Sequence, residues 1–221
     1  MAMHMGVPAH RAFLKKLGLL DPVVTELGPS AAPIVPKRWK KLNTMTIAFG
    51  HGLSVTPLQL ATATVPLVNG GLAVPPTFLP RTREEALTVS TRVLKSETSS
   101  AVVKLMRENV LRGSGKRANA EGYRVGGKTG TAEKVVNGRY ARHSLLNSFL
   151  SVFPTDDPQY VVLVTLDEPQ RVEATNYNST AGVNAAPTVG KVVARIAPIL
   201  GVPPKLGETA SRFDAKRSAT Y

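Results

Sequence analysis

The stretch GGKTGTAEKVV at residues 126–136, followed directly by Asn137-Gly138, decides the fold. Asn-Gly is a strong signal for a two-residue β-hairpin, because both residues tolerate the positive φ that such turns require. Residues 123–136 therefore predict one strand, and the hairpin predicts a second strand that returns beside it and includes residues 148–153. The quoted stretch is expected to form the edge strand of an antiparallel sheet.

Helices are predicted on both sides of this hairpin from apolar periodicity and end signals. Thr56 can cap a helix that has Pro57 at its first position, and Gln59 would complete a capping box. Pro66 removes a backbone hydrogen bond and should kink the last turn of that helix. Ser96 can cap the next helix. The expected helices span residues 8–19, 57–68, 97–111 and 186–199.

The remaining segments complete the fold class. Residues 21–43 are rich in proline and predict irregular structure, whereas residues 72–95 give no decisive pattern. The apolar run at residues 160–166 predicts a strand that is central in the sheet and covered on both faces. Helices, then antiparallel strands, then a helix predict an α+β fold, an antiparallel sheet with flanking helices. We expect one domain over residues 1–200 and a flexible, basic tail over residues 201–221.

The composition limits the classes of function. The formal net charge is +13, from 28 basic and 15 acidic residues, but the basic residues are dispersed. The densest run, residues 37–41, contains Trp39, the only tryptophan; we expect a solvated loop with Trp39 packed on the body, and no nucleic-acid partner. The absence of cysteine excludes disulfides and thiolate metal sites. The four histidines lack metal-ligand spacing, so the sequence predicts no metal and no cofactor.

The sequence also lacks the signals of membrane insertion or export. No apolar run is long enough to span a bilayer, and the first residues lack the charged-then-apolar pattern of a signal peptide. A chain made as written is therefore expected to stay in the cytoplasm.

Residues 122–129, GYRVGGKT, match the phosphate-binding pattern G-x-x-x-x-G-K-[ST]. Residues 161–168 resemble the apolar strand and acidic pair that would hold magnesium, so a nucleotide hydrolase is one alternative. A P-loop, however, follows a buried strand and opens into a helix whose N-terminus faces the phosphates. Residues 114–121 are polar, and the Asn137-Gly138 hairpin leaves no length for a helix, so we keep this alternative as the weaker one.

The Lys-Thr-Gly-Thr segment has the residue types that an acyl-transfer site requires. Lys128 would place a cation beside the reacting group, where it tunes proton movement and attracts a substrate carboxylate. Gly130 would let a substrate backbone lie close to the strand. Thr131 offers a hydroxyl to a carboxylate and a backbone N–H to an oxyanion, and such donors typically lower the barrier by roughly 3 to 4 kcal/mol.

The surroundings of this segment resemble the transpeptidase domain of class B penicillin-binding proteins, and the division-specific peptidoglycan D,D-transpeptidases among them look closest. In those serine enzymes Lys-Thr-Gly is the third of three site motifs. The resemblance extends over roughly residues 6–200. It rests on residues 47–61, which read IAFGHGLSVTPLQLA, and on residues 69–71, 112–118, 126–133, 149–154, 157–158, 161–169 and 185–187.

The resemblance implies a partial penicillin-binding, serine β-lactamase-like fold. In such enzymes a serine attacks the D-alanyl-D-alanine end of a peptidoglycan stem peptide, forms an acyl-enzyme and passes the acyl group to an amine, and β-lactams acylate the same serine. By position, Lys128 would be the catalytic cation, and Lys128, Thr129, Gly130 and Thr131 would bind substrate. Implied partners are stem peptides, lipid-linked precursors, β-lactams and division proteins, at the periplasmic face of the inner membrane.

The sequence departs from this family in one decisive respect. The 221 residues contain neither Ser-x-x-Lys, which holds the nucleophile, nor Ser-x-Asn. The nearest serines to these patterns are Ser90, Ser114 and Ser144, and none fits. Without nucleophile and base, covalent catalysis cannot proceed. We therefore expect the C-terminal part of a transpeptidase domain, inactive alone; the alternative is a non-catalytic module that binds stem peptide or division proteins.

Overall fold

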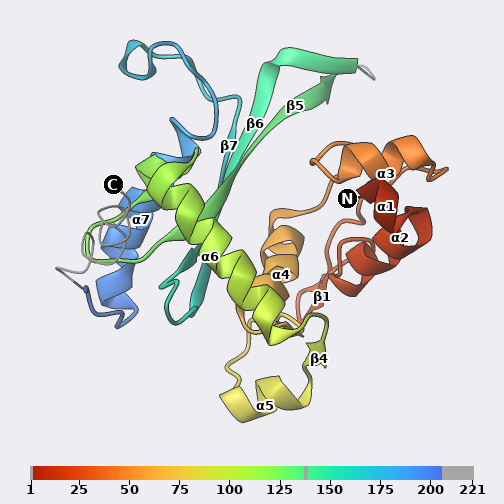
Figure 1. Cartoon of the computed structure of the whole chain (residues 1–221), viewed down its shortest axis with the longest axis horizontal. Helices are drawn as coiled ribbons and strands as arrows, with labels where there is room; N and C mark the ends of the chain where they lie inside the picture. The colour runs from red at the N-terminus through yellow and green to blue at the C-terminus, as the bar shows by residue number, and fades with distance from the viewer. Residues whose placement is uncertain (1, 137–138, 206–221) are drawn as a thin grey trace, which may run out of the picture.

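The computed structural model describes residues 2–136 and 139–205 (Figure 1). The helices are α1 (Ala2–Met5), α2 (Val7–Lys16), α3 (Lys41–Ile47), α4 (Pro57–Val68), α5 (Arg83–Thr88), α6 (Ser96–Arg112) and α7 (Ala185–Ile199), with short 3-10 turns η1 (Lys116–Ala118) and η2 (Glu173–Thr175). The strands are β1 (Val24–Thr25), β2 (Gly28–Pro29), β3 (Leu72–Ala73), β4 (Thr91–Arg92), β5 (Gly126–Val136), β6 (Arg139–Phe153) and β7 (Tyr160–Asp167).

The principal sheet is antiparallel and has the order β5–β6–β7, which confirms the α+β prediction. Lys128 pairs with Leu150 and Gly130 pairs with Ser148, and the register holds until a bulge after Glu133. The segment that carries Lys-Thr-Gly is therefore an edge strand, as its sequence predicts. The predicted turn at residues 137–138 lies outside the described residues.

The prediction that residues 160–166 form a central strand is wrong for the part of the chain that the structure describes. β7 ends the sheet order, and β6 is the central strand. The expected cover on both faces is present, because α7 packs on one side of β7 and α4 on the other. An apolar run indicates that both faces of a strand are covered. It does not indicate whether the strand lies in the centre or at the end of the sheet.

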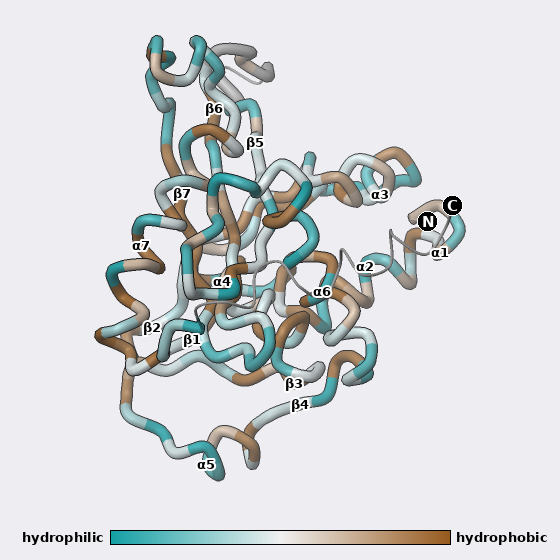
Figure 2. Tube along the Cα trace, turned by 60° about the vertical axis from the view of Figure 1, so that its left-hand side comes forward, coloured by the Kyte–Doolittle hydropathy of each residue, from teal (hydrophilic) through white to brown (hydrophobic). Residues whose placement is uncertain are grey.

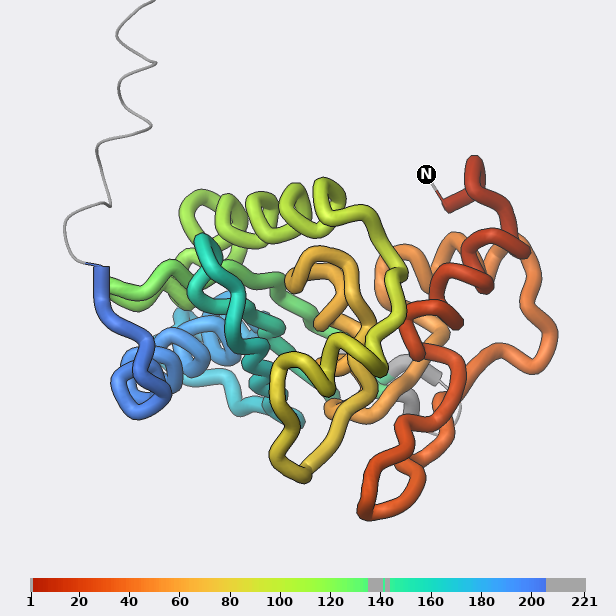
Figure 3. Tube along the Cα trace, turned by 90° about the horizontal axis from the view of Figure 1, so that it is seen from below, coloured from red at the N-terminus to blue at the C-terminus, as the bar shows by residue number. Residues whose placement is uncertain are grey.

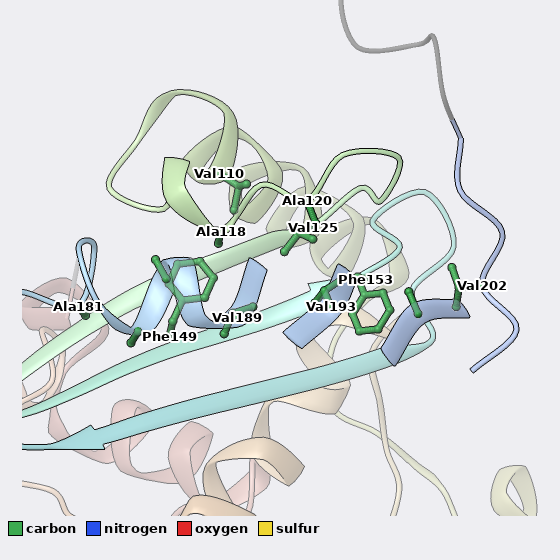
Figure 4. Close-up of a cluster of buried hydrophobic side chains, with 13 residues drawn as sticks. Val110, Ala118, Ala120, Val125, Phe149, Phe153, Ala181, Val189, Val193 and Val202 are labelled. Atoms are coloured by element: carbon green, nitrogen blue, oxygen red, sulfur yellow. The ribbon is translucent and has the colours of Figure 1, made fainter. Parts of the chain in front are cut away.

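The main core lies between the sheet and α7 (Figure 4). Phe149 and Phe153 of β6 point to this side, where they meet Val189 and Val193 of α7 and Val110 of α6. Their alternation along β6 follows from the two-residue period of a strand. Each such side chain contributes roughly 1.5–3 kcal/mol when it is fully buried, so this face holds α7 firmly against the strands.

The opposite face of the sheet is covered by α4 and, beside it, α6 (Figure 3). Val68 of α4, Val103 of α6 and Val152 of β6 form a second buried cluster there. Helix α6 passes so close to β5 that a Cβ at Gly126 would lie 3.1 Å from the backbone nitrogen of Arg107. This contact covers the beginning of the β5 edge.

The helix predicted over residues 57–68 is present, but one detail of its N-terminus differs. Thr56 caps it by accepting the Gln59 N–H over 3.2 Å. The Gln59 side chain does not turn back to complete a capping box. Its Nε2 donates to the carbonyls of Gly18 at 2.8 Å and Asp21 at 2.7 Å, because the buried amide bonds to the loop after α2. Pro66 lies inside the helix, as predicted.

Other helix ends also differ in detail from the predictions. Helix α2 ends at Lys16 rather than at residue 19. Helix α6 begins at Ser96 itself, with Lys95 as the capping residue and no side-chain cap bond, so the expected Ser96 cap is wrong. Helix α7 begins one residue early, at Ala185, after Asn184 caps it. Such ends depend on local hydrogen bonds that periodicity does not encode.

Two short helices fall in segments where none was predicted. α3 begins at Lys41, at the end of the segment 21–43, which otherwise forms the β1–β2 hairpin and loops, and it continues to Ile47. α5 lies within residues 72–95 and begins with a capping box between Thr82 and Glu85. Each spans two turns or fewer, which is too short for a clear apolar period.

Trp39 lies packed between α2 and α3, as expected for the basic run at residues 37–41. Its ring meets the edge of His10 and the guanidinium of Arg11, and its Nε1 donates to Thr44 Oγ1 over 2.9 Å. These contacts occupy the indole, and its packing joins the two helices.

The chain continues against the body beyond α7. Val202 is buried in the main core, and the Lys205 N–H donates to the Gly122 carbonyl over 2.8 Å. The rest of the segment predicted as a tail, residues 206–221, lies outside the described residues. Within the described ranges, no helix combines the length and apolar character needed to cross a bilayer.

Candidate functional site

The free edge of β5 is the first element of the site. Asn109 Nδ2 of α6 donates to the Gly127 carbonyl over 2.8 Å, so the peptide groups of Gly127 point away from β6. In an antiparallel strand the N–H and C=O of one residue point to the same side and alternate between residues. Thr129 and Thr131 therefore also present N–H and C=O groups at this edge, whereas Lys128 and Gly130 bond to β6.

Lys128 supplies the cation of the site. Its side chain is exposed, and Nζ donates to the Thr129 carbonyl over 2.7 Å. An ammonium has three donors, so two remain for an external acceptor. Within residues 2–136 and 139–205 no carboxylate pairs with Lys128, which leaves its charge available to an anionic ligand.

Thr129 is held by a short chain of hydrogen bonds from the end of α6. Thr129 Oγ1 lies 2.8 Å from Ser114 Oγ, and Ser114 Oγ lies 3.2 Å from Asn109 Oδ1. Ser114 follows α6 directly, in the segment that ends the helix at Gly113. The loop after α6 is thereby fixed over the Lys-Thr-Gly segment.

Thr131 is held from the other direction, by the loop before α7. The Ala181 N–H donates to Thr131 Oγ1 over 3.0 Å. That loop is anchored in turn by Asn147 of β6, whose buried amide nitrogen donates to the Ser179 carbonyl and to Asn184 Oδ1. Both threonine hydroxyls of the segment are therefore positioned by loops outside the sheet.

The glycines of this segment have different surroundings. A Cβ at Gly127 would lie 2.4 Å from the Phe149 ring, so only glycine fits there. A Cβ at Gly130 would meet nothing nearer than 3.9 Å. Packing within the protein therefore does not require glycine at 130, and the open space beside it lies on the same face of the strand as Lys128.

The nucleotide-hydrolase alternative is wrong. Residues 126–136 form an antiparallel strand, at the place where a P-loop would open into a helix. The acidic pair Asp167 and Glu168 binds Lys134 Nζ at 2.9 and 3.0 Å, across the end of the sheet. Hydrogen bonds to Asp167 and then Glu168 raise the pKa of Lys134. In the described part of the chain, no cluster of three or more His, Asp or Glu side chains could hold a metal.

The described serines near the strand have structural partners. Ser148 Oγ lies 3.3 Å from Thr165 Oγ1, and the buried Ser151 donates to the Val162 carbonyl over 2.9 Å. Ser114, whose hydroxyl lies beside that of Thr129, bonds to Asn109 and Thr129 and not to a basic group. None of these hydroxyls has the lysine or histidine that would activate it.

Sequence reasoning missed the residues that hold the two threonines. Asn109, Ser114 and Ala181 come from the end of α6 and from the loop before α7, and only the fold brings them to β5. The glycines that flank Ser114 were the available signal, because a serine between two glycines at the end of a helix indicates a tight turn.

Comparison with known proteins identifies the family of the chain. The family model of the penicillin-binding protein transpeptidase domain matches residues 1–194. The probable peptidoglycan D,D-transpeptidase FtsI of Caulobacter vibrioides is 42% identical over 202 residues, which are 86% of this chain and 34% of that protein. Stage V sporulation protein D of Bacillus subtilis is 35% identical over 177 residues, 76% of this chain and 27% of that protein. The chain thus spans about a third of the length of these relatives.

Solved structures agree with the sequence comparison. The transpeptidase domain of penicillin-binding protein 3 from Burkholderia pseudomallei superposes with a TM-score of 0.81 at 29% identity, covering 93% of this chain and 61% of that one. Penicillin-binding protein 3 from Mycobacterium tuberculosis, in complex with ampicillin, gives 0.78 at 25% identity, covering 94% of this chain and 49% of that one. The sheet with its flanking helices and the chain's sequence lead to one assignment: this chain belongs to the penicillin-binding protein transpeptidase family.

Proposed function

We propose that the chain forms the substrate-binding wall of a peptidoglycan D,D-transpeptidase site, which recognises the D-alanyl-D-alanine end of a stem peptide and the carboxylate of β-lactams. The observation that carries this proposal is the free edge of β5, where Lys128 has no carboxylate partner among the described residues and the peptide groups of Thr129 and Thr131 point outward. A bound peptide would extend along this edge as an added strand.

The residues would have separate roles at that edge. Lys128 is proposed as the catalytic cation beside the reacting group, and its free N–H groups attract the substrate carboxylate. The Thr131 N–H donates to the oxyanion, and its hydroxyl donates to the carboxylate. Gly130 leaves room for the substrate backbone beside the strand. Thr129 contributes its outward peptide groups.

Acyl transfer itself requires a nucleophile that these 221 residues do not contain, since neither Ser-x-x-Lys nor Ser-x-Asn occurs. The chain would therefore act as the C-terminal part of a transpeptidase domain and be inactive alone. The relatives named FtsI and penicillin-binding protein 3 favour a role in septal wall synthesis, at the periplasmic face of the inner membrane. Lipid-linked precursors and division proteins would be its partners there.

The test separates binding from chemistry. The ¹⁵N-labelled chain is titrated with N-acetyl-D-alanyl-D-alanine while the amide resonances of β5 are followed by NMR. Saturable shifts at residues 128–131 are expected. Lys128→Ala should weaken binding about tenfold, the effect typical of losing a charged hydrogen bond.

Two controls make the test specific. Lys134→Ala removes a lysine of the same strand whose ammonium is paired with Asp167 and Glu168. This variant should leave the affinity for the peptide unchanged. N-acetyl-L-alanyl-L-alanine controls for stereochemistry. A fluorescent penicillin should give no labelled band after denaturation. An absence of saturable binding, or a covalent adduct on a serine of this chain, contradicts the proposal.

A further inference from the structure

We propose that the lobe formed by helices α1, α2 and α3 docks on the surface of an anionic phospholipid bilayer. The docking surface, which we term the basic face, consists of exposed Lys and Arg side chains on α2 and around the start of α3: Arg11, Lys15, Lys37, Arg38, Lys40 and Lys41. The three helices lie together at the opposite end of the molecule from α7 (Figure 1). This role goes beyond the peptide-binding function proposed above and does not depend on it, because β5 carries none of these residues.

Packing around Trp39 joins the two parts of the basic face. Trp39 stands between Arg38 and Lys40 in the sequence, and the guanidinium carbon of Arg11 on α2 lies 5.7 Å from the centre of its ring. Lys15 follows Arg11 by four residues, so these two side chains lie on the same side of α2. The cations of the helix and of the loop before α3 therefore form one continuous surface.

The cations of the basic face lack counter-charges. Residues 1–50 contain seven Lys and Arg residues but only two acidic residues, Asp21 and Glu26. Glu26 is engaged elsewhere, because its carboxylate accepts hydrogen bonds from the Thr77 hydroxyl and from the Phe78 N–H. Among the ion pairs of the described residues, none involves a member of the basic face. The face is therefore a surface of one sign, which attracts an anionic partner.

Exposed apolar side chains border these cations on α3. Leu42 and Met45 are 67% and 46% exposed, and their three-residue spacing puts them on one side of the helix. Lys41 precedes Met45 by four residues and lies beside this apolar stripe, whereas the buried Thr44 and Ile47 occupy the other side. A surface helix with cations beside exposed apolar residues suits a bilayer interface, where the cations meet lipid phosphates and the apolar side chains enter the acyl boundary.

Other anionic partners fit these features less well. A protein that covered the basic face would have to supply carboxylates for its cations, because a buried unpaired charge is costly. A nucleic acid would meet the cations but offers no apolar layer to the stripe on α3. The ring of Trp39, which would otherwise stack on a base, is occupied by His10 and Arg11. An anionic bilayer satisfies both parts of the surface, with phosphates for the cations and acyl chains for the apolar side chains.

The experiment measures co-sedimentation of the full chain with lipid vesicles. Vesicles of phosphatidylcholine and phosphatidylglycerol in equal parts should bind the chain, and pure phosphatidylcholine vesicles should bind it more weakly by about tenfold or more. Lipid is kept in large excess over protein, so that contacts between copies of the chain do not compete. Raising the salt from about 0.1 M to about 1 M shortens the screening length from about 10 Å to about 3 Å and should release most of the bound protein.

Two charge-matched variants locate the contact. Lys37→Gln combined with Lys41→Gln should weaken vesicle binding about 25-fold, because each basic residue near an anionic surface contributes about fivefold. Lys191→Gln combined with Arg195→Gln removes the same charge from two exposed positions on α7 and should weaken binding by less than about threefold. Equal losses in the two double variants would show that net charge, and not this surface, attracts the lipid, and would overturn the proposal.

Trp39 reports the orientation of the bound chain, because it is the only tryptophan and lies between two residues of the basic face. Phosphatidylcholine with a spin label on its head group, added to the anionic vesicles, should quench its fluorescence. Leu42→Gln should weaken binding about tenfold, because an apolar side chain that enters the acyl boundary is lost. Binding without quenching would mean that another surface meets the lipid, and this result overturns the proposal, as does an absence of binding to the anionic vesicles.

Vesicle binding and peptide binding are expected to be independent of each other. Lys128→Ala should leave vesicle binding little changed, and the Lys37 and Lys41 double variant should leave the affinity for N-acetyl-D-alanyl-D-alanine unchanged. If the chain binds anionic vesicles through the basic face but binds no peptide, the proposed function fails and the membrane contact stands. Tighter binding to a mixed-sequence duplex DNA than to the vesicles, with the same dependence on Lys37 and Lys41, would assign the face to a nucleic acid and overturn the proposal.

Discussion

Gly127 lies so close to Phe149 that a Cβ at this glycine would come within 2.4 Å of the aromatic ring. Phe149 is fully buried and cannot retreat, because α7 and α6 surround it in the main core. Three residues further along β5, a Cβ at Gly130 would meet nothing within 3.9 Å. Gly127, just before the Lys-Thr-Gly motif, therefore serves the packing of the core, and Gly130, within the motif, leaves the β5 edge open.

Gly127→Ala is expected to destabilise the domain by about 2 kcal/mol, because overpacking a rigid core typically costs 1–3 kcal/mol. Gly130→Ala should change the free energy of unfolding by less than about 0.5 kcal/mol, as for other exposed sites. It should still weaken the binding of N-acetyl-D-alanyl-D-alanine, because the new methyl occupies the open space. Urea unfolding measures the stability of the two variants, and the NMR titration measures their binding of the peptide. Equal losses of stability in Gly127→Ala and Gly130→Ala would contradict the assignment of packing to Gly127 alone.

Gln59→Ala is expected to cost about 3 kcal/mol of stability. The side chain is buried, and its amide nitrogen holds the carbonyls of Gly18 and Asp21, so the variant leaves a cavity and removes both bonds. Thermal unfolding followed by circular dichroism measures the change. Gln159→Ala is the matched control, since that glutamine is exposed and should shift stability by less than about 0.5 kcal/mol. Similar values for the two variants would show that the loop after α2 does not depend on Gln59.

Gln59 also marks a limit of what the sequence could predict. Thr56, Pro57 and the helix over residues 57–68 follow from local rules, because a cap and a proline act on neighbouring backbone groups. The partners of Gln59 lie about 40 residues away, and no local rule names them. The edge position of β5 was predictable for the same reason as the helix, since Asn137-Gly138 signals a hairpin locally.

The candidate site likewise combines residues that a local motif predicts with residues that only the tertiary fold brings together. Residues 128–131 were predictable because the chemistry and the family motif lie within four consecutive residues. Asn109 and Ser114 were not, because they reach β5 only through the packing of α6 on that strand.

The stability of the domain should fall more steeply below about pH 4 because of Asp156. Partial burial tends to raise its pKa, but the hydrogen bond from Lys205 and the charge of Arg124, 3.0 Å away, outweigh burial and lower it below 3.8. A carboxylate with a depressed pKa in the folded state stabilises the protein above its unfolded-state pKa. That contribution disappears as the pH falls through the lower, folded-state pKa.

Asp156→Asn should therefore lose less stability than the wild type between about pH 5 and about pH 3, while being the less stable protein at neutral pH. Urea unfolding at several pH values measures both differences. Asp157→Asn is the matched control, because the Asp157 side chain accepts a hydrogen bond from Gln159 and has no cation beside it among the described ion pairs. If the stability of Asp156→Asn and of the wild type changes with pH in parallel, the ion pairs of Asp156 with Arg124 and Lys205 are not a source of acid sensitivity.

The N-terminal helices should cause self-association of the isolated chain. Helices α1, α2 and α3 contact mainly one another. Apolar residues recur along their trace (Figure 2), and several of them are exposed. Leu42 and Phe49, on and just after α3, are 67% and 70% exposed. Replacing both with glutamine should reduce association in sedimentation velocity, with little change in stability, because exposed substitutions typically alter it by less than about 0.5 kcal/mol. Leu105→Gln, at a 70% exposed position on α6, is the matched control. If Leu105→Gln reduces association as much as the α3 variant does, general surface hydrophobicity and not this helical face drives the contact.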